Sequence, residues 1–87
     1  MKVGTDDDIA AIVRAANGEG VTLVLEDGES LAHVTMRAAI APLAVERAPM
    51  RVNAVVAGHG AAPADVLAAI AFLDGARSTT GQILRVG

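Results

Sequence analysis

The chain contains no cysteine, no tryptophan and no tyrosine, and it has a single phenylalanine among its 87 residues. Without cysteine there is no disulfide, no thiolate metal site and no cysteine nucleophile. Only Phe72 could stack on a ligand ring. Since 53% of the residues are nevertheless hydrophobic, the core must be built from Ala, Val, Leu and Ile, whose small volumes suit close packing of helices on a sheet.

Basic residues are few as well. Seven Lys and Arg residues are scattered among ten Asp and Glu residues, which gives a net charge of -3 and argues against a nucleic-acid partner. No run approaches the ~20 consecutive apolar residues that a membrane helix needs. Three aspartates, Asp6, Asp7 and Asp8, stand where the apolar segment of a signal peptide would begin. We therefore expect a cytoplasmic protein without membrane contact.

The chain has two histidines that could join these aspartates in a metal site. The spacing of His33 and His59 relative to residues 6–8 matches no known ligand pattern. Acidic residues in the first turn of a helix are already explained by the helix dipole. The sequence therefore predicts no metal site.

Helical and strand periodicities alternate along the chain. The predicted elements are a helix over 6–16, a strand over 21–25, a helix over 30–48, a strand over 51–57, a helix over 63–75 and a strand over 82–86. Pro42 falls inside the second helix and predicts a kink or a restart there. The order α-β-α-β-α-β predicts one α/β domain, residues 1–87, with about three parallel strands and helical cover.

The second and third helices carry apolar residues on two sides, which is more than one sheet face can bury. In the second helix, one stripe holds Leu31, Val34, Ala38, Ala41 and Val45, and another holds Met36, Ile40 and Leu43. This excess predicts self-association or a protein partner. The expected association surface comprises Ile9, Met36, Ile40, Leu43 and Leu67.

Three short motifs are similar to those of one known family. They are Leu43-Ala44-Val45-Glu46, Arg51-Val52-Asn53-Ala54-Val55 and Thr80-Gly81-Gln82-Ile83-Leu84. Together they resemble the C-terminal half of the short-chain dehydrogenase/reductase family. The resemblance implies a truncated Rossmann-like, three-layer α/β/α unit with the first two helices on one face and the third on the other. It also implies a left-handed final crossover and an exposed edge strand over 21–25.

The resemblance has consequences for cofactor and partners. The family binds NAD or NADP on a glycine-rich turn in its first half, and this sequence has no counterpart of that turn, so we expect no cofactor. Family members also associate through the helices that correspond to residues 6–16 and 30–48, and through the last helix and strand. The resemblance therefore implies that this chain retains the surfaces through which family members associate.

Carried over residue by residue, the family's active site is missing. The catalytic tyrosine falls on Glu29 and the lysine on His33, while the serine falls near Glu26 or Asp27. Ala57 stands where a proline contacts the nicotinamide. The resemblance thus implies a non-catalytic protein that acts by association, with itself or with a full-length dehydrogenase.

Two alternatives remain open. Gly58, His59 and Gly60 follow the carboxyl end of a predicted strand, where α/β sheets bind ligands, so a small-ligand-binding protein is one alternative. Glu29 and His33 lie four residues apart at a helix start and are the proton-transfer candidates of a residual or repurposed oxidoreductase. The simpler interpretations are a flexible turn for the first set and a surface pair for the second.

Overall fold

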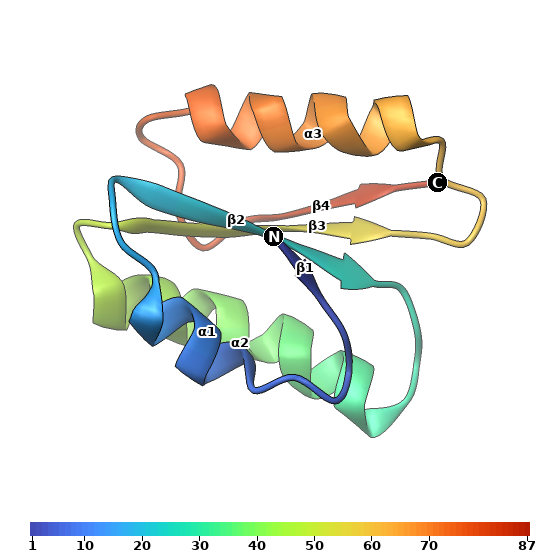
Figure 1. Cartoon of the computed structure of the whole chain (residues 1–87), viewed down its shortest axis with the longest axis horizontal. Coiled ribbons are helices and arrows are strands. Elements are labelled where there is room, and N and C mark those ends of the chain that lie inside the picture. The colour runs from blue at the N-terminus through green and yellow to red at the C-terminus, as the bar shows by residue number, and fades with distance from the viewer.

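The chain folds into a four-stranded parallel sheet with three helices (Figure 1). The computed structural model describes residues 1–87. In chain order the elements are β1 (Lys2–Val3), α1 (Ile9–Ala15), β2 (Gly20–Glu26), α2 (Leu31–Arg47), β3 (Arg51–Ala57), α3 (Pro63–Gly75) and β4 (Ile83–Val86). The predicted α/β class with a parallel sheet is confirmed. None of the helices is long and apolar enough to cross a membrane.

Strand β1 corrects the predicted sheet, which had about three strands and began with a helix. It pairs with β2, with Lys2 opposite Val24 and Val3 opposite Leu25. The Val24 N–H donates to the Met1 carbonyl over 2.7 Å. The prediction that residues 21–25 form an exposed edge was therefore wrong for Val24 and Leu25, whereas residues 21–23 have no partner in β1. A two-residue strand has no periodicity of its own, so the sequence pattern could not reveal it.

The helices are divided between the two faces of the sheet. Figure 1 shows α1 and α2 below the sheet and α3 above it. The strand order β1-β2-β3-β4 means that each crossover advances one strand in the same direction. The third crossover must therefore have the opposite hand from the first two. With the usual right hand for those two, the connection from β3 through α3 to β4 is left-handed, as the family resemblance implied.

Most of the core lies between the sheet and the helices α1 and α2. Leu23 and Leu25 of β2 cluster there with Val52 and Val56 of β3, and each is at most 2% exposed. By contrast, Leu73 is the only buried residue of α3. The helical side chains in the cluster are Ile9, Val13, Met36, Ile40, Leu43 and Ala44.

This burial corrects the predicted association surface. Ile9, Met36, Ile40 and Leu43 are 9%, 7%, 0% and 5% exposed, so they stabilise the monomer and are not open to a partner. Leu67 is 66% exposed, as that prediction requires. Both stripes of α2 are apolar, and spacing alone does not tell which of them faces the sheet. The outer stripe is the one formed by Leu31, Val34, Ala38, Ala41 and Val45.

Two side chains determine where α1 and α2 begin. The Asp8 carboxylate accepts a hydrogen bond from the Ala11 N–H over 3.1 Å, so α1 begins at Ile9 and not at residue 6. Ser30 is the N-cap of α2. That helix then continues through Pro42 without the restart that we considered.

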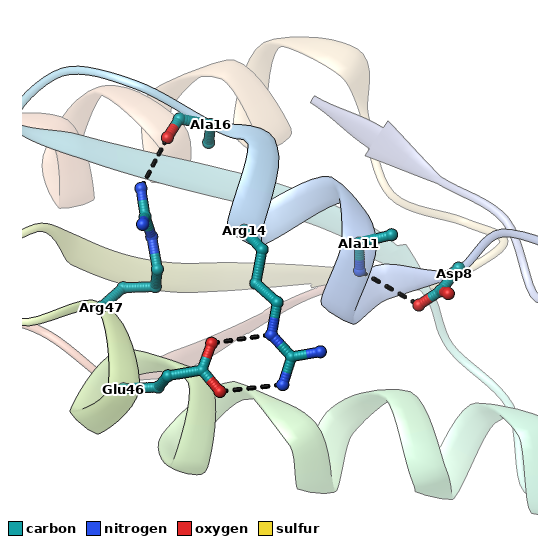
Figure 2. Close-up of polar contacts among 6 residues, drawn as sticks. All are labelled: Asp8, Ala11, Arg14, Ala16, Glu46 and Arg47. Carbon is teal, nitrogen blue, oxygen red and sulfur yellow. Dashed lines mark hydrogen bonds and ion pairs between the residues drawn. The ribbon is translucent and has the colours of Figure 1, made fainter.

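Two arginines join the ends of α1 and α2 (Figure 2). Arg14 Nε and Nη2 donate to the two carboxylate oxygens of Glu46 over 2.7 and 2.8 Å. Arg47 Nη2 donates to the Ala16 carbonyl over 2.7 Å. The hydrogen bond from Arg14 lowers the pKa of Glu46, and the same bond raises the pKa of Arg14. These contacts hold the short α1 against α2.

The lowered pKa of Glu46 predicts a pH-dependent contribution to stability. The Arg14–Glu46 pair stabilises the folded chain above the ordinary pKa of a glutamate, and this contribution disappears as the pH falls through the lowered pKa of Glu46. The melting temperature of Glu46→Gln should therefore be lower than that of the wild type at pH 7. The two melting temperatures should converge below about pH 4. Since both side chains are exposed, the difference should be small.

Glu19→Gln is the matched control, because Glu19 is exposed and its carboxylate forms no ion pair. Its melting temperature should follow wild type at both pH values. A difference between Glu46→Gln and wild type that is constant across the pH range would contradict the assigned role of the pair.

Candidate functional site

The carboxyl ends of the strands meet on the right of Figure 1, where the loops into α1, α2 and α3 begin. We call this the carboxyl edge. Open α/β sheets bind ligands at such an edge. The structure places all the candidate residues here, on the loops after β2 and β3 or in the first turn of α2: Glu29, His33, Gly58, His59 and Gly60.

His33 is held in the first turn of α2 by three neighbours. Its Nδ1 lies 2.5 Å from the Ser30 hydroxyl oxygen, and its Nε2 lies 3.9 Å from a carboxylate oxygen of Glu26. The ring packs against the α-carbon of Gly28, where an added Cβ would come within 2.6 Å of Nδ1. Gly28 is therefore required for the position of the imidazole.

Glu29 does not pair with His33. Because Ser30 is the N-cap of α2, Glu29 precedes the helix, and the i, i+4 geometry of a helical face does not apply to it. Its exposed carboxylate takes part in no ion pair. The structure thus brings His33 together with Ser30 and Glu26, and leaves Glu29 in solvent.

The loop after β2 is held by contacts with distant segments. Arg37 Nη1 donates to the Gly28 carbonyl over 2.7 Å, and Arg85 Nη1 donates to the Asp27 carboxylate over 3.1 Å. The Asp27 N–H donates to the Ala57 carbonyl over 3.2 Å. Asp27, one of the two positions nearest to the family's serine, therefore ties β4 and β3 to this loop.

The loop after β3 is anchored at its first residue. The Gly58 N–H donates to the Val86 carbonyl over 2.8 Å. His59 and Gly60 are exposed, and His59 forms no ion pair. A hollow of about 250 Å³ lies between His59, Lys2 and the ends of β2 and β3. Pockets for small molecules usually measure about 300–1,000 Å³, so this hollow is small for a ligand site.

The carboxyl edge is acidic. Its cations are Lys2, Arg37 and Arg85, and the last two already donate to Gly28 and Asp27. No three His, Asp or Glu side chains converge closely enough to hold a metal ion. The carboxylates on the loops and helix starts of this edge are Asp6, Asp7, Asp8, Glu26, Asp27, Glu29 and Asp65.

Hydrogen bonds join the family motif in β3 to the motif in the turn before β4. Asn53, only 2% exposed, donates from Nδ2 to the Thr79 carbonyl over 2.9 Å and accepts from the Gln82 N–H over 3.0 Å. The Thr80 hydroxyl accepts from the Val52 N–H over 3.0 Å. These two motifs are therefore halves of one hydrogen-bonded arrangement and serve the frame of the sheet.

Comparison with known protein families identifies the family of this chain. The model of the SDR-like family, described as short chain dehydrogenase-like protein, matches residues 5–86. The chain therefore belongs to the short-chain dehydrogenase-like family. Comparisons with curated proteins and with solved structures gave no match.

The sequence interpretation missed Ser30 and Glu26 as partners of His33. A usable signal was present, because Ser-x-x-His at a helix start places a capping hydroxyl and the third helical side chain on the same turn. Residue 30 was predicted to be the first residue of the helix and not its N-cap, so the contact between its hydroxyl and His33 was not predicted. Glu26 is the last residue of β2, and only the fold brings a strand end beside the first turn of a helix.

The buried Asn53 predicts a measurable loss of stability. Asn53→Ala removes both of its hydrogen bonds and leaves the Thr79 carbonyl and the Gln82 N–H without this partner. We expect a loss of about 1–3 kcal/mol in the free energy of unfolding, measured by urea denaturation. Asn17→Ala, in an exposed loop, should stay within about 0.5 kcal/mol of wild type. Equal effects of the two substitutions would contradict the structural role of Asn53.

Proposed function

We propose that this short-chain dehydrogenase-like protein has no dehydrogenase activity and acts through association, with itself or with a full-length dehydrogenase. The observation that supports this most is the exposure of large apolar side chains. Leu31, Val45, Leu67 and Phe72 are 82%, 79%, 66% and 64% exposed. Grouped apolar side chains on a protein surface mark interaction sites.

The first surface is the outer stripe of α2, which we call the α2 stripe: Leu31, Val34, Ala38, Ala41 and Val45. Its intervals alternate between three and four residues, which is the spacing of a seam between two helices. The two alanines in the middle allow close approach of a second backbone, and the larger residues at both ends fill the space beside it. An antiparallel second copy satisfies this pattern, because a two-fold contact pairs one end of the stripe with the other.

The second surface is the outer side of α3, which we call the α3 surface: Ala64, Leu67, Ala68, Ala71 and Phe72. The helix carries only two charged residues, Asp65 and Asp74. A helix that is apolar on all sides is usually buried on all sides. This outer side is therefore the second candidate for a contact with another chain.

The carboxyl edge supports the loss of dehydrogenase chemistry. The residues at the tyrosine and lysine positions, Glu29 and His33, do not pair with each other, and His33 interacts with Ser30 and Glu26. Because Glu26 and Asp27 add negative charge at the strand end, dinucleotide phosphates are disfavoured there. We therefore infer that NAD and NADP are not cofactors of this chain.

Ligand binding by Gly58, His59 and Gly60 is the alternative function. It is supported by the position of this loop beside the hollow at the carboxyl edge. The volume of about 250 Å³ is small for a ligand site, whereas the α2 stripe and the α3 surface each extend along a whole helix. Association is therefore the function that we favour.

Charged substitutions on the two surfaces test the proposal. Val34→Asp and Leu67→Asp each place a carboxylate on an exposed apolar position, which should change monomer stability by no more than about 0.5 kcal/mol. We expect light scattering after size-exclusion chromatography to give a mass above 8.7 kDa for the wild type. At least one of the two variants should return to the monomer mass with an unchanged circular dichroism spectrum.

Ala62→Asp is the matched control, because residue 62 is the exposed N-cap of α3 and aspartate is favourable at that position. It introduces the same charge outside both surfaces and should leave the mass unchanged. A wild type that stays at 8.7 kDa, alone and when mixed with dehydrogenases of its own cell, would overturn the proposal.

A further inference from the structure

Ser30, His33 and Glu26 form a linked set at the carboxyl edge. When the Ser30 hydroxyl donates to Nδ1 of His33, over 2.5 Å, the ring proton lies on Nε2 and faces the Glu26 carboxylate 3.9 Å away. Gly28 holds the ring in this position, because any side chain there would collide with it. A hydroxyl hydrogen-bonded to an imidazole base is the central part of an activated nucleophile, and at 3.9 Å the Glu26 carboxylate is near His33 without forming a hydrogen bond to it.

Ser30 also lies in a turn from a strand to a helix, with the sequence Gly28-Glu29-Ser30-Leu31-Ala32. Gly-x-Ser-x-Gly turns between a strand and a helix present nucleophilic serines, and alanine replaces the second glycine here. The backbone of Ser30 is extended, with φ −65° and ψ 160°, so the helix cap and His33 position the hydroxyl and backbone strain does not. The N–H groups of Leu31 and Ala32 follow directly and donate no hydrogen bond to another residue of the chain.

We propose that Ser30 is an acyl acceptor that reacts with small activated esters, with His33 as its general base. Ser30 Oγ attacks the acyl carbon, a bond forms between them, and the bond from that carbon to the leaving oxygen breaks. The hydroxyl proton moves to Nδ1 of His33 and then to the leaving oxygen, which departs as an alcohol. The acyl group remains on Ser30 as an ester, and no electron is transferred.

The surroundings define the class of ester. The oxyanion that forms on the acyl carbon would be stabilised by the free N–H groups at the start of α2. The acidic carboxyl edge disfavours anionic acyl donors, so neutral or cationic esters are expected to react faster than anionic ones of the same size. Glu26 borders both His33 and the hollow of about 250 Å³, which suits a small acyl group. This reactivity is chemically separate from hydride transfer and does not depend on association.

Acetylation by p-nitrophenyl acetate tests the proposal. The rate of p-nitrophenolate release and the intact mass of the protein are measured, and the acetylated residue is located by peptide mapping. We expect one acetyl group on Ser30 of the wild type. His33→Gln should lower the rate of acetylation at Ser30 by at least about 100-fold, the lower range for a general base. Ser30→Asn preserves an N-cap residue and should abolish this acetylation without loss of the helix.

Ser78 provides the internal control, because it is exposed and is the only other serine in the chain. It should stay unmodified, and Ser78→Ala should react like the wild type. Equal acetylation of Ser30 and Ser78, acetylation confined to amino groups such as that of Lys2, or an unchanged rate in His33→Gln would overturn the proposal. Leu67→Asp on α3, which lies on the opposite side of the sheet from α2 (Figure 1), should retain the reaction, so its failure is distinguishable from a failure of association.

Discussion

The burial of β3 on both faces is the constraint on which the rest of the structure depends. Residues 52–56 are all buried, because β2 and β4 pair with the two sides of the strand while α2 and α3 pack on its faces. Asn53 is the polar residue in this stretch, and the turn before β4 satisfies its amide. Since these interactions lie within the sheet and on its faces, they do not depend on Glu29 or His33 at the carboxyl edge.

The sequence predicted the fold well where the pattern was long and regular. The strand predicted over 51–57 is confirmed as β3, and the helix predicted over 63–75 is confirmed as α3. The failures had local physical causes. β1 is too short to show a period, and α1 begins at Ile9 because Asp8 is its cap. The two apolar stripes of α2 are chemically alike, so only the packed structure shows that Met36 and Ile40 face inward.

Prediction of the candidate site from the sequence was less complete. The family motifs singled out Glu29 and His33, and their spacing of four residues suggested a pair that the structure does not form. Ser30 ends the loop as a cap, which separates Glu29 from the helix and leaves the hydroxyl beside His33. Glu26 approaches from the end of β2. A contact of that kind depends on the fold, so no local pattern contains it.

The chain, a member of the short-chain dehydrogenase-like family, thus combines a four-stranded parallel sheet with two apolar surfaces, the α2 stripe and the α3 surface, that the monomer leaves exposed. The most direct test of this account is native mass spectrometry of the tagged protein, isolated gently from its own cells. We expect multiples of the 8.7 kDa chain, or the chain bound to a full-length dehydrogenase. A single 8.7 kDa species without any companion would contradict it.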